Sequence, residues 1–124
     1  MLKVVKFGGS SLSNEVQFKK VRDIVLSSPE RRIVVVSALG KRNSSDSKIT
    51  DLLYILNAHI KYSVPYEDIW KMIETRFVEV KEPLNLGFDM SSELASLKSE
   101  LKSGISEDYL VSRGEYLTAR LMAD

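Results

Sequence analysis

Lys6-Phe7-Gly8-Gly9-Ser10-Ser11 follows directly on the apolar run Leu2-Lys3-Val4-Val5. A buried strand is therefore predicted to end in two glycines and two hydroxyls before a helix begins. Glycines have no Cβ, so their backbone N–H groups can approach a polyphosphate closely, and the helix N-terminus adds positive partial charge. Lys6 places a full cation beside them. The pattern predicts a nucleotide-binding loop.

Two better-known glycine motifs do not describe this loop. A Walker loop has four residues between its glycines and a lysine after them, and a dinucleotide fingerprint has the spacing G-x-G-x-x-G. Here the lysine precedes the adjacent pair Gly8-Gly9. A tight strand-to-helix turn with a solvated lysine is the alternative that the six residues leave open.

Composition narrows the class of protein. The chain has 124 residues, 44% hydrophobic and 28% charged, with a net charge of +1, which is typical of a globular domain. Lys and Arg are scattered, so we expect no nucleic-acid partner. No apolar run is long enough for a bilayer, and the first residues begin a strand rather than a signal peptide, so we expect a cytoplasmic protein that does not bind membranes.

Absent and rare residue types exclude several chemistries. The chain has no cysteine, which fits a reducing compartment and excludes disulfides, thiolate catalysis and Cys-based zinc sites. His59 is the only histidine and lies in a helical pattern. We interpret it as a surface or packing residue.

Two short apolar segments, 2–7 and 33–37, lack alternation and are predicted to be parallel strands buried on both faces. Asn14 and Gln17 form a capping-box start for the helix between them, which ends before Pro29. Its predicted apolar stripe consists of Val16, Val21, Ile24 and Val25. In a right-handed βαβ unit both strand ends meet at one sheet edge, where ligands of open α/β sheets bind.

Four helical patterns follow the polar segment 40–47, which we interpret as an exposed flexible loop. Thr50 or Ser47 is expected to cap the first helix, and Gly104 to end the third. The apolar positions of the four helices are Leu52, Leu53, Ile55 and Leu56; Ile69, Trp70, Ile73 and Phe77; Leu94, Leu97 and Leu101; and Leu110, Gly114, Leu117 and Leu121.

The predicted strands are too few for the number of predicted helices. Two parallel strands cannot cover the apolar faces of five helices, and the last helical pattern reaches Asp124 without a stop signal. We therefore expect residues 1–124 to be the N-terminal portion of a larger α/β domain, with no second domain. Folded alone, the chain would have to cover an exposed sheet edge by rearranging or oligomerising.

Three further segments carry candidate site residues. Ser37 ends the second strand beside the glycine loop, and Thr50 opens a helix, where simple capping is the alternative. Gly114 lies inside a helix, which costs roughly 1 kcal/mol relative to alanine and suggests a close approach to another element. The adjacent Glu115 is either a solvated carboxylate or an acceptor for an amino group.

Taken in order, these segments closely resemble the N-terminal part of the aspartate kinases, which belong to the amino acid kinase superfamily. The resemblance spans essentially the whole chain and rests on Lys6–Ser11, Val34–Ala38, Thr50–Leu53 and Val111–Glu115, with Leu121-Met122-Ala123. It implies a three-layer α/β/α parallel sheet of the amino acid (carbamate) kinase type, present here as an N-terminal fragment. The implied reaction transfers the ATP γ-phosphoryl group to the side-chain carboxylate of L-aspartate and gives 4-phospho-L-aspartate. That product leads toward lysine, threonine, methionine and diaminopimelate.

The resemblance also implies residue roles. Lys6 neutralises charge on the transferring phosphoryl group, and the N–H groups of Gly8 and Gly9 hold the β- and γ-phosphates. Ser10 and Ser37 line the junction of phosphate and substrate, Thr50 contacts aspartate, and Glu115 binds its α-amino group. Mg2+ bridges the phosphates through water and nucleotide oxygens, so no protein metal ligand is expected in this chain.

Some family features have no counterpart in these residues. The resemblance places the adenine pocket, the arginine for the aspartate α-carboxylate and the regulatory ACT domains beyond Asp124, and segment 40–48 is longer than in some relatives. We therefore expect the chain alone to be inactive, and the full-length protein to be a homo-oligomer. The alternatives are another superfamily kinase, acting on glutamate, acetylglutamate or uridylate, and a non-catalytic assembly module.

Overall fold

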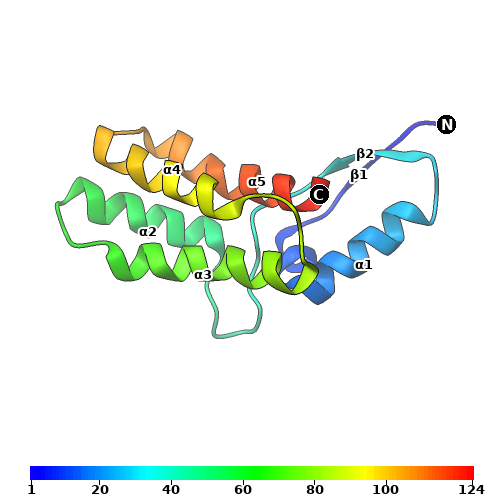
Figure 1. Cartoon of the computed structure of the whole chain (residues 1–124), viewed down its shortest axis with the longest axis horizontal. Helices are drawn as coiled ribbons and strands as arrows, with labels where there is room; N and C mark the ends of the chain where they lie inside the picture. Colours follow the sequence, from blue (N-terminus) through cyan, green and yellow to red (C-terminus); the bar gives the residue numbers. More distant parts are fainter.

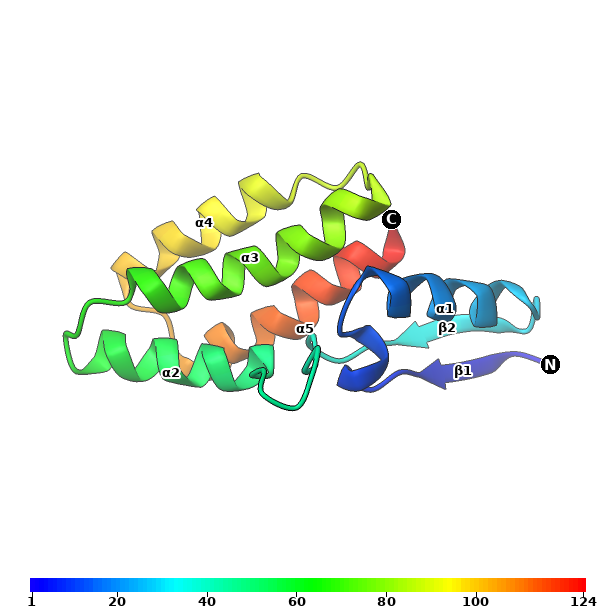
Figure 2. The ribbon, with the colours of Figure 1, turned by 90° about the horizontal axis from the view of Figure 1, so that it is seen from below.

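A computed structural model describes residues 1–124, which form two strands, a short 3-10 helix and five α-helices (Figure 1). In chain order these are β1 (Lys3–Lys6), η1 (Gly9–Leu12), α1 (Glu15–Leu26), β2 (Arg31–Val35), α2 (Ile49–Lys61), α3 (Glu67–Leu84), α4 (Met90–Ser103) and α5 (Glu107–Ala123). Figure 2 shows the strands and α1 at one end of an elongated molecule, and α2 to α4 gathered beyond the strand ends. None of the helices has the length and apolar character needed to cross a membrane.

The predicted βαβ unit is confirmed. β1 and β2 pair in parallel, with Val5 opposite Val34, and α1 is the connection between them. The Oδ1 atom of Asn14 accepts a hydrogen bond from the Gln17 amide at 3.0 Å, so α1 begins at the predicted cap. Because the strands are parallel, the segments after both of them emerge at the same end of the sheet.

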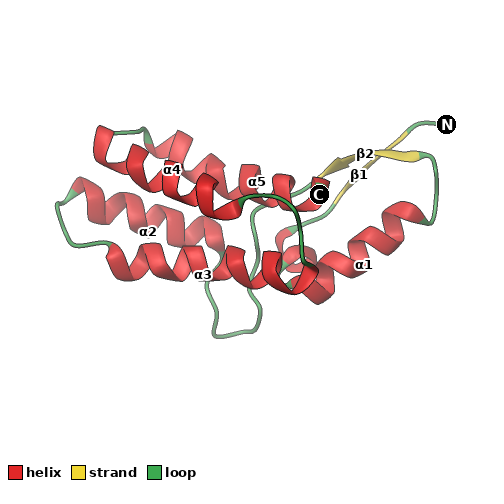
Figure 3. Ribbon diagram, viewed as in Figure 1, coloured by secondary structure: helices red, strands yellow, loops and turns green.

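The prediction that both strands are buried on both faces is wrong. Side chains alternate along each strand, and the outward-facing residues are Val4, Ile33 and Val35, which are 62, 46 and 42% exposed. Val5 and Val34, on the opposite face, are half-buried. The reason is that the sheet has only two strands and α1 packs beside β2 on one face (Figure 3).

The predicted apolar stripe of α1 is also partly wrong. Val16 and Ile24 are exposed, whereas Phe18 and Val21 are the buried residues of this helix. Phe18, Val21 and Val25 are spaced three and four residues apart and share one face of α1. The half-covered sheet needs only this narrow face, so the other apolar residues of α1 point to solvent.

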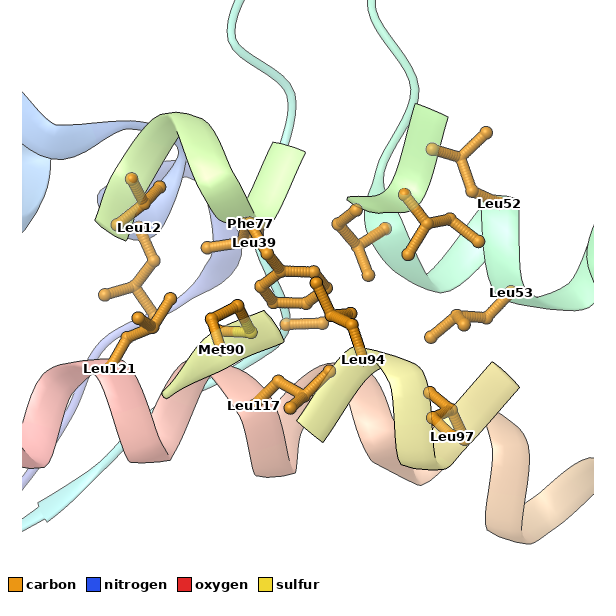
Figure 4. Close-up of a cluster of buried hydrophobic side chains, with 14 of the residues drawn as sticks. Leu12, Leu39, Leu52, Leu53, Phe77, Met90, Leu94, Leu97, Leu117 and Leu121 are labelled. Atoms are coloured by element: carbon orange, nitrogen blue, oxygen red, sulfur yellow. The ribbon is translucent and has the colours of Figure 1, made fainter. Parts of the chain in front are cut away.

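The four predicted helices after the loop are all present, and their leucines build the main core. Figure 4 shows Phe77 of α3 surrounded by leucines from several elements. Asp89 and Ser106 cap α4 and α5, and Gly104, with a φ of 81°, ends α4 as predicted. The start of α2 differs, because its N-cap is Lys48 and no side chain caps the helix, so neither Thr50 nor Ser47 does so.

Gly114 makes a close contact with other elements, as its position inside a helix predicts. A Cβ built on Gly114 would lie 3.0 Å from the Ala38 Cβ, 3.1 Å from Leu53 Cδ1 and 3.2 Å from Ile49 Cγ2. The missing side chain therefore lets α5 rest on α2 and on the segment that follows β2. This contact also places the next residue, Glu115, beside the ends of the strands.

We expect Gly114→Ala to destabilise the protein. Overpacking in a filled core costs typically 1–3 kcal/mol, more than the roughly 1 kcal/mol that alanine gains in helix propensity. Urea unfolding should show a lower free energy of unfolding. Ser99→Ala, at an exposed position of α4, is the control and should leave stability unchanged or slightly higher. Equal or higher stability of Gly114→Ala would contradict the packing argument.

Candidate functional site

A hollow of about 510 Å³ lies where the two strands end. Its walls come from the segments after β1 and β2, the start of α2 and one turn of α5. The lining residues are Gly9, Ser10, Ser37, Ala38, Leu39, Gly40, Lys41, Lys48, Thr50 and Glu115. The expectation that both strand ends contribute to one edge site agrees with this arrangement.

Most of the predicted site residues meet in this hollow. Gly9 and Ser10 come from η1, Ser37 follows β2, Thr50 is the second residue of α2, and Glu115 comes from α5. These segments are far apart in sequence, so only the fold brings their side chains together. What each of them binds stays a prediction.

Lys6 and Gly8 do not line the hollow. Lys6 is the last residue of β1, opposite Val35, and its side chain is exposed. Gly8 precedes η1 in an extended conformation, with φ −79° and ψ 173°. Gly8 therefore lies directly before the lining residue Gly9, and Lys6 lies three residues before it, both outside the wall itself.

The glycines of this region have different surroundings. A Cβ on Gly8 would meet nothing within 4 Å, so a ligand can approach its backbone. A Cβ on Gly9 would lie 3.2 Å from the Ala38 carbonyl oxygen. A Cβ on Gly40 would overlap the Gly9 carbonyl and lie 2.7 Å from the Ser10 amide nitrogen. The Gly40 amide also donates to the Gly9 carbonyl at 3.0 Å, so two backbone segments touch here.

Sequence reasoning missed Gly40, Lys41 and Lys48 as lining residues. Gly40 and Lys41 lie in segment 40–47, which we interpreted as an exposed flexible loop, and Lys48 follows it directly. A glycine shortly after a strand signals a close backbone approach, and this signal marks Gly40. No local pattern marks the two lysines, because their position depends on how the loop folds back.

The loop is held by ion pairs. Arg42 donates to Asp46 from its Nε at 2.7 Å and from its backbone amide at 2.9 Å, and its Nη1 donates to Glu79 of α3 at 2.7 Å. The hydrogen bonds from Arg42 hold the pKa of the Asp46 carboxyl well below its usual range, even though partial burial opposes this. Asp46 is therefore charged at neutral pH and serves as a structural anion of the loop.

The charged groups in and beside the hollow are free to meet a ligand. Lys6, Lys41, Lys48 and Glu115 form no salt bridge within the chain. The lysines can attract an anion such as a phosphate, and the carboxylate can accept hydrogen bonds from an amine. No group of three or more His, Asp or Glu side chains is placed to hold a metal ion.

Two other features lie outside this site. His59 of α2 donates from Nδ1 to the Ile55 carbonyl at 2.9 Å and does not line the hollow. A second hollow, of about 280 Å³ between α1, β2 and α5, is lined mainly by apolar residues such as Val34 and Met122. It lacks the convergent polar groups that orient a charged ligand.

Comparison with known proteins identifies similar chains. Residues 1–124 match the model of the amino acid kinase family. Aspartokinase 3 of Bacillus subtilis is 35% identical over 98% of this chain and 28% of its own length. Chloroplastic aspartokinase 1 of Arabidopsis thaliana is 33% identical over 97% of this chain and 22% of its own length. The chain thus spans about a quarter of the length of these curated relatives.

Solved structures agree with the fold. The aspartate kinase of Clostridium acetobutylicum is 46% identical, with a TM-score of 0.93 over 97% of this chain and 28% of that one. Escherichia coli aspartokinase III, in complex with aspartate and ADP, is 25% identical, with a TM-score of 0.71 over 98% of this chain and 28% of that one. The fold class is therefore the parallel sheet with helices of the amino acid kinases, of which this chain carries a part.

Gly40→Ala and Gly8→Ala should differ sharply in stability. We expect Gly40→Ala to lower the free energy of unfolding by about 3 kcal/mol, because its methyl group overlaps backbone that has no room to move. Gly8→Ala should stay within about 0.5 kcal/mol of the wild type, because the added atom meets open space. Urea unfolding of both variants measures this difference, and similar stabilities would contradict the backbone contact.

Proposed function

This chain belongs to the amino acid kinase family, and we propose that it supplies the phosphate-binding and aspartate-binding part of an aspartate kinase active site. The proposed reaction transfers the γ-phosphoryl group of ATP to the side-chain carboxylate of L-aspartate. The observation that carries this proposal is the single hollow lined by Gly9, Ser10, Ser37, Thr50 and Glu115. The similarity to the aspartokinases supports the choice of acceptor.

The phosphate side of the proposed site is formed by Lys6, Gly8, Gly9 and Ser10. The open space around Gly8 lets a phosphate approach the backbone, and Gly9 is held in place by its contact with Gly40. Lys6 ends β1 with an ammonium group that has no ion-pair partner. We assign it the neutralisation of charge on the transferring phosphoryl group, because it precedes the glycines and its charge is free.

The aspartate side is formed by Ser37, Thr50 and Glu115. Glu115 follows Gly114, whose tight packing fixes this turn of α5 against the start of α2. Its exposed carboxylate binds the α-amino group of aspartate by charge-assisted hydrogen bonds. Thr50 does not cap α2, so its hydroxyl is available to the substrate.

The reaction requires the protein mainly to position the two substrates and to stabilise negative charge. The acceptor carboxylate of aspartate is ionised at neutral pH, so its oxygen attacks the γ-phosphorus without a general base. The bond between the γ-phosphorus and the β,γ-bridging oxygen breaks, and ADP leaves with that oxygen. Lys6 and the backbone N–H groups stabilise the negative charge on the transferring group. When bound, Mg2+ neutralises phosphate charge through nucleotide oxygens and water, and this chain offers it no cluster of carboxylates.

Other parts of the interpretation are proposals of the same kind. Residues 1–124 form the N-terminal portion of one amino acid kinase domain, which the family match over these residues supports. The protein acts in the cytoplasm on the small molecules ATP and L-aspartate, and it functions as a homo-oligomer. The exposed residues Val4, Ile33 and Val35 are apolar surface that further protein would cover.

Lys6→Met should abolish most of the activity of the natural protein that carries these residues. We expect kcat to fall at least about 100-fold, the usual effect of removing one group that stabilises transition-state charge. Lys3→Met is the matched control, because Lys3 lies on the same strand but pairs with Glu30 at 3.0 Å. Coupled assays of ADP release with aspartate, glutamate, acetylglutamate and uridylate test the acceptor at the same time.

The proposal would be supported by turnover that requires Lys6 and that occurs with aspartate but with none of the other three acceptors. Turnover with another acceptor would assign the chain to a different kinase of the family. Wild-type activity in Lys6→Met would remove the proposed role of this lysine and favour a non-catalytic role for the segment.

Glu115→Gln should weaken aspartate binding more than ATP binding. The neutral amide cannot form an ion pair with the α-amino group, so we expect KM for aspartate to rise about tenfold. KM for ATP should change less than twofold. Glu82→Gln, which removes an exposed carboxylate of α3, is the control. An unchanged KM for aspartate would contradict the assignment of Glu115.

A further inference from the structure

Arg76 of α3 is the one charged side chain that the fold buries, with 3% of its surface exposed. Burying a guanidinium is costly unless its N–H groups find partners. Burial lowers the pKa of Arg76 from its usual value, and the charge of Asp46 opposes that effect. An arginine stays protonated in proteins, so Arg76 keeps its charge and needs hydrogen-bond acceptors in the interior.

Arg76 binds both ends of the loop between β2 and α2, which crosses α3 in the view of Figure 1. Its Nη2 donates to the Gly40 carbonyl, and its Nη1 donates to the Ser47 carbonyl at 2.7 Å. Nη1 also lies 3.3 Å from the Asp46 carboxylate. One planar fork therefore joins two backbone positions seven residues apart from two nitrogens held at a fixed spacing, whereas a lysine would have to reach both carbonyls from a single nitrogen.

The loop that Arg76 holds is in direct contact with the proposed phosphate site. The Gly40 amide donates to the Gly9 carbonyl at 3.0 Å, and the Ile49 amide donates to the Leu39 carbonyl at 3.0 Å, which closes the base of the loop. Arg76 itself does not line the hollow. Its influence on a ligand must therefore pass through the loop.

Each carbonyl that Arg76 holds belongs to the peptide immediately before a lysine that lines the hollow. Gly40 precedes Lys41, and Ser47 precedes Lys48. All peptide bonds are trans, so the N–H of each lysine points away from Arg76. The two hydrogen bonds thus fix the orientation of both peptide planes, and each plane includes the Cα atom from which the side chain of the lysine starts.

We propose that Arg76 is a positioning residue that, by clamping the Gly40 and Ser47 carbonyls, holds Lys41 and Lys48 beside the triphosphate of the nucleotide. This inference rests on the proposed function, because that function supplies the triphosphate. Lys41 and Lys48 have no ion pair in the chain, so their charge is available to an anion. The clamp turns a structural arginine into a determinant of phosphate affinity.

The first test is hydrogen exchange in the natural protein that carries these residues. In Arg76→Met, exchange over residues 40–49 should rise about tenfold, while α4 and α5 keep their protection. Arg22→Met is the matched control, because the Arg22 guanidinium is exposed and pairs only with its neighbour Asp23. Unchanged exchange over residues 40–49 would overturn the clamp.

The second test is a double-mutant cycle, with inorganic triphosphate as the probe and its Kd measured by calorimetry. Arg76→Met and the pair Lys41→Met with Lys48→Met should each weaken binding about tenfold, the scale expected for losing charge-assisted contacts. Combining all three changes should weaken binding no further than the lysine pair alone. A combined effect equal to the product of the separate effects would overturn the proposal, because it would mean that Arg76 acts independently of the lysines.

Arg76→Lys keeps the charge but not the fork, and it replaces Arg76→Met in the cycle if the methionine variant does not fold. It should bind triphosphate with an affinity between those of the wild type and Arg76→Met. Affinity equal to the wild type would overturn the proposal, since charge alone would then suffice. Failure of the proposed function can be distinguished from failure of this inference. In the first case, triphosphate binding would still depend on Arg76, but the protein would not phosphorylate aspartate.

Discussion

The backbone contact between Gly9 and Gly40 is the constraint on which the candidate site depends. Two parallel strands bring their carboxyl ends to one edge, but only bare glycine backbone lets the following segments touch there. The Gly40 amide and the Gly9 carbonyl then share a hydrogen bond, so the two segments form one continuous wall. Every residue of the hollow is placed relative to that wall.

The helices beyond the sheet act on this junction from two directions. Gly114 lets α5 rest against Ala38, which brings Glu115 into the hollow from one side. Arg76 of α3 donates hydrogen bonds to the Gly40 and Ser47 carbonyls and does not line the hollow itself. The leucine-rich core that α3 and α5 share keeps these two contacts in a fixed relation. Stability of the helical part and geometry of the site are therefore linked through a few close contacts.

Sequence patterns were most reliable where one local interaction settles the structure. Asn14 caps α1 because its side chain needs only the amide of Gln17, and Gly104 ends α4 because glycine tolerates a positive φ. Patterns failed where burial depends on what lies opposite. Val4 and Ile33 read as interior residues, yet they are exposed because no element covers their face of the sheet. The predicted cap of α2 also failed: Lys48 is the N-cap, no side chain caps the helix, and the carbonyl of the preceding Ser47 accepts a hydrogen bond from the distant Arg76.

The amino-acid sequence alone determined the βαβ start, the glycine loop and the four later helices, because each has a local signature in residue type and spacing. The other motif residues that line the hollow, Ser37, Thr50 and Glu115, were identified by their resemblance to a family. Only the tertiary structure decided that Lys41 and Lys48 face the same hollow, that Lys6 and Gly8 stand just outside its wall, and that a single buried arginine spans the loop. These features depend on contacts between residues many positions apart. Such contacts leave no periodicity in the chain, because they exist only once the helices have packed.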